Sequence, residues 1–158
     1  SGLCLAAKSA YCAAFLQGKI QKRYLALVCG RLTQGGTITA PIGREEGSVI
    51  RRCVRPDGKP AVTHYTPLSW NEAYTLVSLT LETGRTHQIR VHLAHIGCPI
   101  IGDDKYGDRV GNRSFPAGLR LTATRIVFPN KLDGLEYLCG KSIEIEPPYN
   151  TQLIKNQL

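Results

Sequence analysis

Residues 81–97 hold most of the side chains that could take part in chemistry. The pattern reads as the end of a strand, a glycine turn and a helix start, and the first turn or so of that helix carries Arg85, His87, Gln88 and Arg90. A helix start already attracts anions, because its free N–H groups and its dipole are positive. Cations there are unfavourable unless a phosphate or a carboxylate faces them. The stretch therefore indicates an anion-binding site.

Histidines at positions 87, 92 and 95 raise the question of a metal site. The His-Glu-x-x-His pattern of zinc enzymes is missing from the sequence, and no carboxylate at a suitable spacing completes a ligand set. We therefore expect no metal. His92 and His95 are expected to be hydrogen-bonded structural side chains, and His87 is expected to lie near a ligand.

The elements that position these residues are predicted from capping and periodicity. Ser9 can cap a helix over 9–17 that Gly18 ends, and Thr86 can cap a second helix that runs to Ile96. The segments 37–40 and 49–54 suggest a hairpin-like excursion. These features predict one α+β domain over residues 1–158, with a mainly antiparallel mixed sheet and few helices. The expected strands cover 22–29, 37–40, 49–54, 61–67, 74–82, 119–128 and 142–146.

The net charge favours a polyanionic partner. Twenty Lys and Arg against twelve Asp and Glu give +8, and residues 1–59 carry ten basic and three acidic side chains of these totals. A positive charge concentrated in one part of the chain suits a nucleic acid, although a merely soluble basic protein would have the same composition. No apolar run approaches the roughly 18 residues that span a bilayer, so no membrane association is expected.

The six cysteines form no C-x-x-C or similar pair that could begin a zinc site. Cys4, Cys12, Cys29 and Cys139 each stand among apolar neighbours, as small buried thiols do. We expect reduced core cysteines in a cytoplasmic protein.

Two motifs make the sequence similar to a known family. GRTHQIRVH at 84–92, followed by PIIGDDKYG at 99–107, closely resembles the RluA family of RNA pseudouridine synthases. KRYLALV at 22–28 resembles the second motif of that family, and LRLTATRIVFP at 119–129 resembles its C-terminal strand segment. The likeness runs from Ser1 to about Pro148.

This resemblance implies the pseudouridine synthase catalytic fold and the isomerisation of a uridine in RNA, ribosomal or transfer, without cofactor or metal. In the family an aspartate attacks the nucleoside, the glycosidic bond breaks, and uracil re-attaches through C5. Tyr24 matches the tyrosine that lies against the base and is a candidate for removing the C5 proton. Arg90 matches the partner of the aspartate, and Ile89 matches an apolar residue beneath the site. The other expected substrate-binding residues are His87, Gln88, Arg85, Lys22 and Arg23.

Further RNA contacts are expected from the polar hairpin at 51–59, where positive side chains can reach phosphates. A solvated charged loop is the alternative for each residue taken alone, whereas contact is favoured for the cluster as a whole. The residues concerned are Arg51, Arg52, Arg55 and Lys59.

The nucleophile of the family lies outside this sequence. Its motif, R-L-D-x-x-T-S-G, ends in two residues that match Ser1-Gly2, which places the aspartate four residues before Ser1. None of the five aspartates present is a convincing replacement, so an N-terminally truncated, inactive catalytic domain is expected. If Arg90 is partly buried, it would then lack its partner unless another anion or a separate segment fills the place. A charge left unpaired in this way predicts that Arg90→Met stabilises the chain.

Two alternatives remain open from the sequence. The chain could be a non-catalytic RNA-binding protein that uses only its basic face, or a half-enzyme that a separate upstream chain completes. The resemblance also allows an S4-like RNA-binding domain upstream as a further partner.

Overall fold

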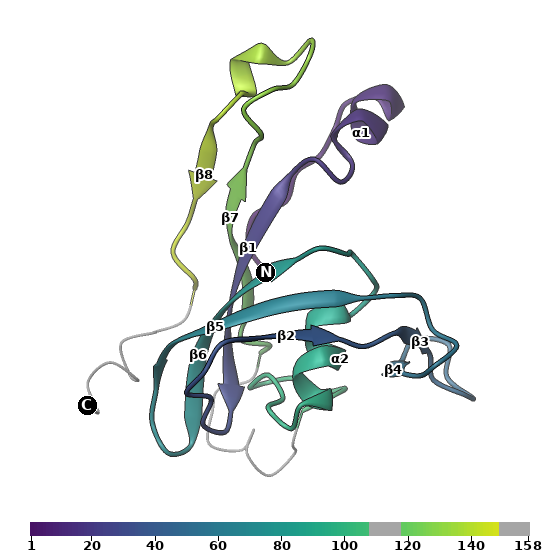
Figure 1. Ribbon diagram of the computed structural model, residues 1–158, viewed down its shortest axis with the longest axis vertical. Helices are drawn as coiled ribbons and strands as arrows, with labels where there is room; N and C mark the ends of the chain where they lie inside the picture. Colours follow the sequence, from purple (N-terminus) through teal and green to yellow (C-terminus); the bar gives the residue numbers. More distant parts are fainter. Residues whose placement is uncertain (108–117, 149–158) are drawn as a thin grey trace.

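The computed structural model describes residues 1–107 and 118–148, and a six-stranded antiparallel sheet forms its centre (Figure 1). The strand order is β2-β5-β6-β1-β7-β8, and β3 and β4 form a separate two-stranded sheet. The predicted α+β class is confirmed. The strands are β1 Gln21–Cys29, β2 Gly36–Thr39, β3 Ile42–Arg44, β4 Arg52–Val54, β5 Val62–Trp70, β6 Tyr74–Leu81, β7 Leu121–Val127 and β8 Ser142–Glu144; the helices are α1 Ala10–Leu16, α2 Gln88–His95 and the 3₁₀ turn η2 Glu136–Leu138.

Helix α2 packs against the middle of the sheet. Ile89 and Leu93 of α2 join Val77 and Leu79 of β6 and Val28 of β1 in one buried cluster. Removing these large apolar side chains from water stabilises the contact, at about 25 cal/mol per Å² of buried apolar surface. The residues that begin α2 are therefore held rigidly over strands β1 and β6.

The upper end of the molecule is an arm made by the outer parts of β1 and β7 together with β8, α1 and η2 (Figure 1). Leu16 of α1 packs there against Ile126, Phe128 and Leu132. Ser9 caps α1 as predicted, because its hydroxyl accepts a hydrogen bond from the Cys12 N–H at 3.2 Å.

Two sequence predictions are corrected by the structure. Segment 36–39 is an edge strand of the large sheet and pairs with β5, so the hairpin is formed by β3 and β4 instead. Helix α2 also begins later than predicted, and Thr86 does not cap it. The reason is the backbone of His87, whose φ of 57° lies in the left-handed region. A residue in that region cannot form part of a right-handed helix, so α2 begins only after His87.

The cysteines are all free within the described residues, but the prediction of buried thiols is wrong for most of them. Cys98 is buried, whereas Cys12, Cys29 and Cys139 are only partly buried and Cys4 is exposed. Cys4 lies in an extended segment in which side chains alternate between two faces, so its apolar neighbours in sequence do not surround it in space.

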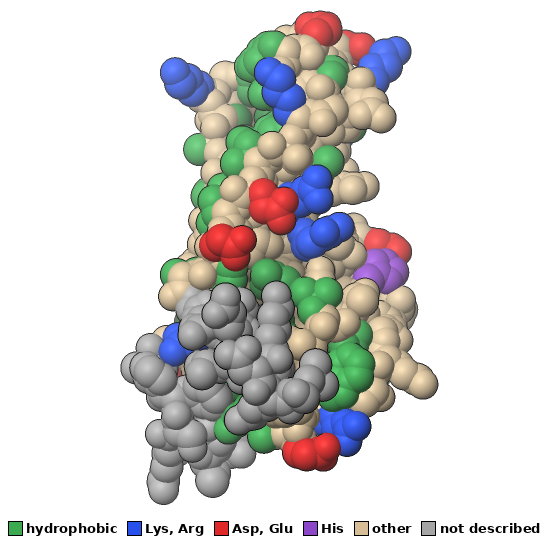
Figure 2. All heavy atoms as spheres, turned by 90° about the vertical axis from the view of Figure 1, so that its left-hand side faces the viewer, with side chains coloured by type: hydrophobic (Ala, Val, Ile, Leu, Met, Phe, Trp, Pro, Cys, Tyr) green, Lys and Arg blue, Asp and Glu red, His purple; other side chains and the backbone are tan. Residues whose placement is uncertain are grey.

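Basic and acidic side chains are interspersed on the face that Figure 2 shows. The excess positive charge of the chain is therefore not spread over this side of the surface. In the part of the chain that the structure describes, no helix is long and apolar enough to cross a membrane.

Candidate active site

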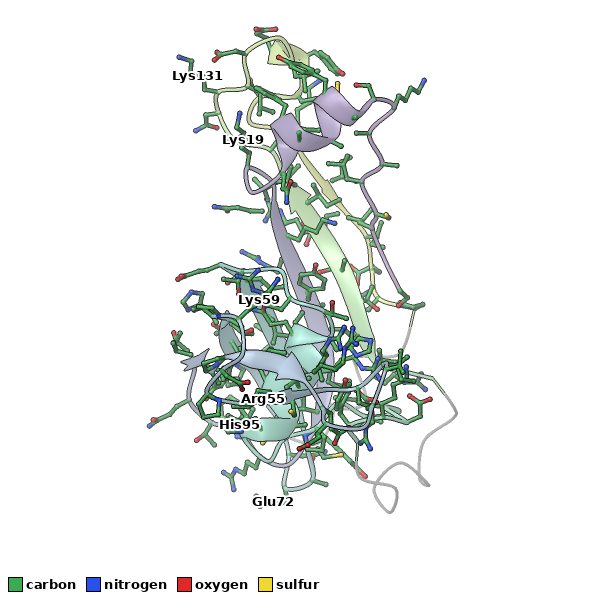
Figure 3. The ribbon with its side chains drawn as sticks, turned by 90° about the vertical axis from the view of Figure 1, so that its right-hand side faces the viewer. Lys19, Arg55, Lys59, Glu72, His95 and Lys131 are labelled. Atoms are coloured by element: carbon green, nitrogen blue, oxygen red, sulfur yellow. The ribbon has the colours of Figure 1, made fainter. Side chains whose placement is uncertain are left out.

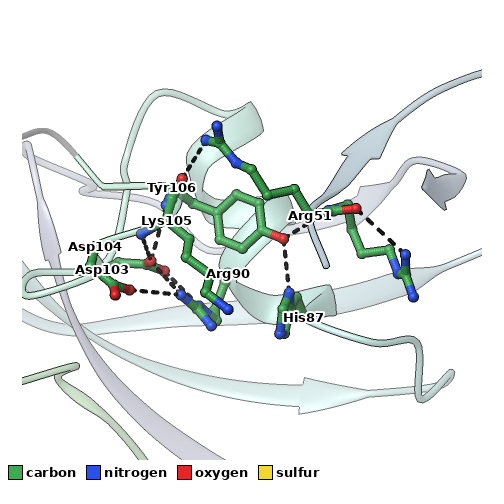
Figure 4. A network of polar contacts seen from close by, with 8 residues as sticks. Arg51, His87, Arg90, Asp103, Asp104, Lys105 and Tyr106 are labelled. Atoms are coloured by element: carbon green, nitrogen blue, oxygen red, sulfur yellow. Dashed lines mark hydrogen bonds and ion pairs between the residues drawn. The ribbon is translucent and has the colours of Figure 1, made fainter. Parts of the chain in front are cut away.

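Arg90 and Asp103 form a buried ion pair beside the start of α2 (Figure 4). The guanidinium donates from Nε to Oδ2 at 2.7 Å and from Nη2 to Oδ1 at 2.5 Å, the two-pronged geometry that suits this pair best. The Arg90 side chain is 14% exposed and that of Asp103 is 0% exposed. Of the alternatives left open for Arg90, another anion fills the place: Asp103 pairs with it, so the charge is not unpaired.

Asp103 is held as a structural carboxylate. Burial alone would raise its pKa, but hydrogen bonds from Arg90 and from the backbone N–H groups of Tyr106 and Lys105 outweigh this and lower the pKa of Asp103 below its ordinary value. Its oxygens already accept four hydrogen bonds and reach no solvent. These contacts agree with its assignment as a structural residue, since a nucleophile needs an accessible oxygen.

Tyr24 of β1 lies in the core cluster that contains Ile89 of α2. In the sheet Tyr24 faces Ala123 of β7, and Gly2 bridges the same Ala123 in parallel orientation. The start of the chain is therefore hydrogen-bonded to one edge of β7, and Tyr24 of β1 lies at the other edge of that strand. Burial raises the pKa of the Tyr24 hydroxyl, so it is protonated at neutral pH.

Tyr106 connects the β3–β4 hairpin to α2, a role that its position in the sequence does not predict. Its hydroxyl oxygen lies 2.8 Å from Nδ1 of His87 and accepts the Arg52 N–H at 2.9 Å. The Arg90 guanidinium lies over its ring, 5.0 Å from the centroid. Tyr106 belongs to the GDDKYG motif, but nothing local in that motif predicts contacts with residues 19 and 54 positions away.

His87 lies at this junction, with its Nδ1 against the Tyr106 hydroxyl, and its expected place near a ligand stays a prediction. Burial and the positive charges of Arg90, Lys105 and Arg52 lower the pKa of His87. A neutral imidazole can accept the Tyr106 hydroxyl proton at Nδ1 and then carries its own proton on Nε2.

Gln88 and His92 are buried parts of a hydrogen-bond chain, not surface groups. Gln88 donates from Nε2 to Thr63 Oγ1 at 3.1 Å, and Thr63 Oγ1 lies 2.8 Å from His92 Nδ1. His92 Nε2 lies 2.9 Å from the Ala40 carbonyl and donates to it. Gln88, which was expected to bind substrate, is 2% exposed and instead closes the turn before α2 by accepting the Arg85 N–H. The structural assignment of His92 is confirmed, whereas His95 is exposed.

The buried His92 predicts an acid-sensitive fold. Burial lowers the pKa of His92, so below about pH 6.5 the unfolded chain binds a proton that the folded chain resists. We expect the free energy of unfolding to be constant above this pH and to fall between pH 6.5 and 5, by at most about 1.4 kcal/mol per pH unit for this group. Urea unfolding at each pH measures it. His92→Gln should flatten the dependence and the exposed His95→Gln should not; equal slopes in all three proteins would contradict the assignment.

The residues expected to contact RNA separate into three groups: those paired with carboxylates, those that line one cavity, and those that lie apart from both. Arg55 is bound to Asp57 by two hydrogen bonds, and Arg51 pairs with Glu45 at 3.2 Å. The other hairpin residues, Arg52 and Lys59, line a cavity together with Arg85 of the turn before α2. Lys22 lies apart from them, in a hollow beneath α1, and Arg23 is exposed next to Arg125 of β7.

The described residues contain no group of three or more His, Cys, Asp or Glu side chains that could hold a metal ion. The arrangement of Tyr24, Ile89, Arg90 and Asp103 offers a protonated phenol, an apolar floor and a fixed cation. Such a set can bind a flat polar ring and orient an anion that attacks it.

Comparisons with known proteins identify the family of the chain. The sequence model of the RNA pseudouridylate synthase family matches residues 1–95. An uncharacterized RNA pseudouridine synthase of Bacillus subtilis is 48% identical over 113 residues, which cover 68% of this chain and 40% of that protein. Ribosomal large subunit pseudouridine synthase D of Xanthomonas campestris is 46% identical over 134 residues, which cover 82% of this chain and 40% of that protein.

The chain spans less than half the length of these curated relatives. Among solved structures, human RNA pseudouridylate synthase domain containing 1 superposes with a TM-score of 0.75 at 29% identity, covering 92% of this chain and 61% of that one. The family match covers more than half of the chain and carries the Tyr24 and Arg90 motifs. The chain therefore belongs to the RNA pseudouridine synthase family, of the RluA type that its motifs resemble.

Proposed function

We propose that this chain forms the uridine-binding part of an RNA pseudouridine synthase active site. The observation that carries the proposal is the meeting of Tyr24 and Ile89 in one cluster, with Arg90 next to Ile89 on α2. The position of the N-terminal residue supports the proposal. The Ser1 amino group donates a hydrogen bond to the Leu121 carbonyl at 3.3 Å, and the Leu121 side chain packs against the same cluster, so Ser1 lies beside the proposed site. A residue four positions before Ser1 lies at most about 14 Å from it, within reach of this cluster.

The reaction is an isomerisation, so all atoms of the uridine are retained. The aspartate of the R-L-D-x-x-T segment attacks the target nucleoside, and the bond between N1 and C1′ breaks. Uracil turns and bonds to C1′ through C5, which releases the aspartate carboxylate from the nucleoside; C5 then loses its proton and N1 gains one. In this scheme Tyr24 lies against the base and removes the C5 proton, and Ile89 packs beneath it.

Arg90 orients the attacking carboxylate in this proposal. Asp103 engages its Nε and Nη2, whereas Nη1 donates to no atom of residues 1–107 or 118–148. An incoming carboxylate can bind this third nitrogen, and a cation within about 4–6 Å lowers the pKa of a carboxylate by roughly 1–3 units. Asp103 is then a positioning residue, which keeps the guanidinium fixed while the nucleophile attacks.

We propose ribosomal RNA of the large subunit as the substrate class, because several relatives are named ribosomal large subunit pseudouridine synthases. An enzyme that changes a base in RNA must reach that base outside the stacked helix, so we expect the target uridine to lie in a loop or bulge. Transfer RNA is the alternative class and serves as the comparison substrate.

Tritium release from RNA that contains 5-tritiated uridine tests the proposed function. The 158-residue chain is assayed beside a version extended upstream by the R-L-D-x-x-T segment, on large-subunit ribosomal RNA and on transfer RNA. We expect release from the extended version alone, and none when its aspartate is replaced by asparagine. Restored release when the segment is added as a separate chain would identify a half-enzyme. RNA binding without release from either version would identify a non-catalytic binding protein and overturn the proposal.

A further inference from the structure

A cavity of about 500 Å³ lies between the β3–β4 hairpin and the turn before α2. Four cationic side chains line it: Arg44, Arg52 and Lys59 from the hairpin region and Arg85 from the turn. Arg44 stands at the end of β3, opposite Arg52 of β4 in the strand pairing. The tertiary structure thus brings together charges that lie up to 41 positions apart in the chain.

Within residues 1–107 and 118–148 no carboxylate neutralises these four charges. None of them forms an ion pair within 4 Å with a carboxylate of the described residues. The only acidic residue among those lining the cavity is Asp57, and Arg55 binds both of its oxygens at 2.5 and 2.8 Å. Arg55 in turn donates to the Arg44 carbonyl at 3.0 Å, so it serves the hairpin itself. Four cations that share one hollow repel one another unless an anion binds among them.

The cavity wall at Gly84 is bare backbone. A Cβ built at this position would meet no atom within 4 Å, and Gly84 is not among the glycines of positive φ. Neither packing nor backbone conformation therefore requires a glycine here. A glycine at this position does allow a ligand to approach the main chain closely.

We propose that this cavity binds a backbone phosphate of the RNA substrate, with Arg44 as a member of the site beside Arg52, Lys59 and Arg85. The inference rests on the proposed function and deepens it. Phosphate is the anion that several converging cations recognise best, and a cavity of this volume accommodates a nucleotide-sized group. Arg51 and Arg55, whose charges are already paired, are not part of this site.

Binding of a labelled single-stranded RNA by fluorescence anisotropy, at several salt concentrations, tests the site. The variants are Arg44→Gln and Lys59→Gln, both at exposed positions, and their combination. Lys131→Gln is the matched control, because it removes the same charge far from the cavity, at the top of the molecule in Figure 3. Circular dichroism and thermal unfolding verify that each variant folds like the parent chain.

We expect each site variant to bind RNA more weakly and to reduce the slope of log K against log salt by about 0.7, the value for one lost phosphate contact on a single strand. The Lys131→Gln slope should equal that of the parent. Unchanged affinity and slope in the Arg44→Gln and Lys59→Gln double variant would overturn the inference, as would failure of the parent chain to bind RNA.

Two further arms identify the source of the phosphate and separate this inference from the proposed function. An RNA with methylphosphonate linkages, which carry no charge, should bind the parent more weakly, with a smaller loss in the double variant. Displacement of RNA by millimolar inorganic phosphate would instead indicate a site for free phosphate and overturn the RNA assignment. Tritium release by the extended chain is measured separately, so a failed phosphate site leaves the isomerase proposal standing, and the reverse also holds.

Discussion

Arg90→Met is expected to lower the free energy of unfolding of this chain by about 3–5 kcal/mol. Removing the guanidinium takes away the charged partner that binds both oxygens of Asp103 and leaves its fully buried carboxylate ionised, although the backbone N–H groups of Lys105 and Tyr106 still donate to it. The contact between Arg90 and the ring of Tyr106 is lost as well. Urea unfolding followed by circular dichroism measures the change. This expectation reverses the one drawn from the sequence, in which an unpaired Arg90 made Arg90→Met stabilising.

A double-mutant cycle gives the coupling between the two residues. Asp103→Asn keeps the acceptor for the two backbone N–H groups but removes the charge, so Arg90→Met and Asp103→Asn together should cost less than the sum of the single changes. Arg31→Met is the control, because Arg31 and Glu72 form an ion pair at 2.6 Å with exposed side chains. We expect Arg31→Met to lower the free energy of unfolding by less than about 1 kcal/mol. A change of similar size in Arg31→Met and Arg90→Met would contradict the buried-pair argument.

Tyr24→Phe is expected to reduce the turnover of the upstream-extended chain by about 10²- to 10⁴-fold, the usual contribution of a general base. The phenylalanine ring keeps the surface on which uracil lies, so KM should change little while kcat falls. Tyr24→Leu removes the ring as well and should raise KM in addition. Tritium release from 5-tritiated-uridine RNA measures both constants.

The pH dependence gives a second readout for Tyr24. Burial raises the pKa of its hydroxyl, so phenolate is scarce at neutral pH and the rate should rise with pH in the parent protein. The residual rate of Tyr24→Phe should lack this rise. A kcat for Tyr24→Phe within threefold of the parent would remove Tyr24 from the chemistry and leave it a purely structural role in the core.

The local elements of this protein were predictable from its sequence. Ser9 and Gly18 predicted the ends of α1, and alternating apolar residues in 74–82 predicted β6, because capping and side-chain periodicity depend on neighbours a few positions apart. The motifs at 22–28 and 84–92 predicted the family, which the comparisons confirmed. The approximate place of α2 was predicted as well, but its first residue was not, since the left-handed turn at His87 depends on Gln88 folding back onto residues 83 and 85.

The partners of the charged groups were decided only by the tertiary structure. Asp103 and Arg90 are 13 positions apart with no periodic relation, and they meet because α2 packs on the sheet and the following loop returns beside it. The tertiary structure also places Arg44, Arg52, Lys59 and Arg85 around one cavity. The number of charges can be read from the sequence, but the distances between the charged groups cannot. Because electrostatic and hydrogen-bond energies fall steeply with distance, which charge is neutralised and which is available to RNA follows from the fold alone.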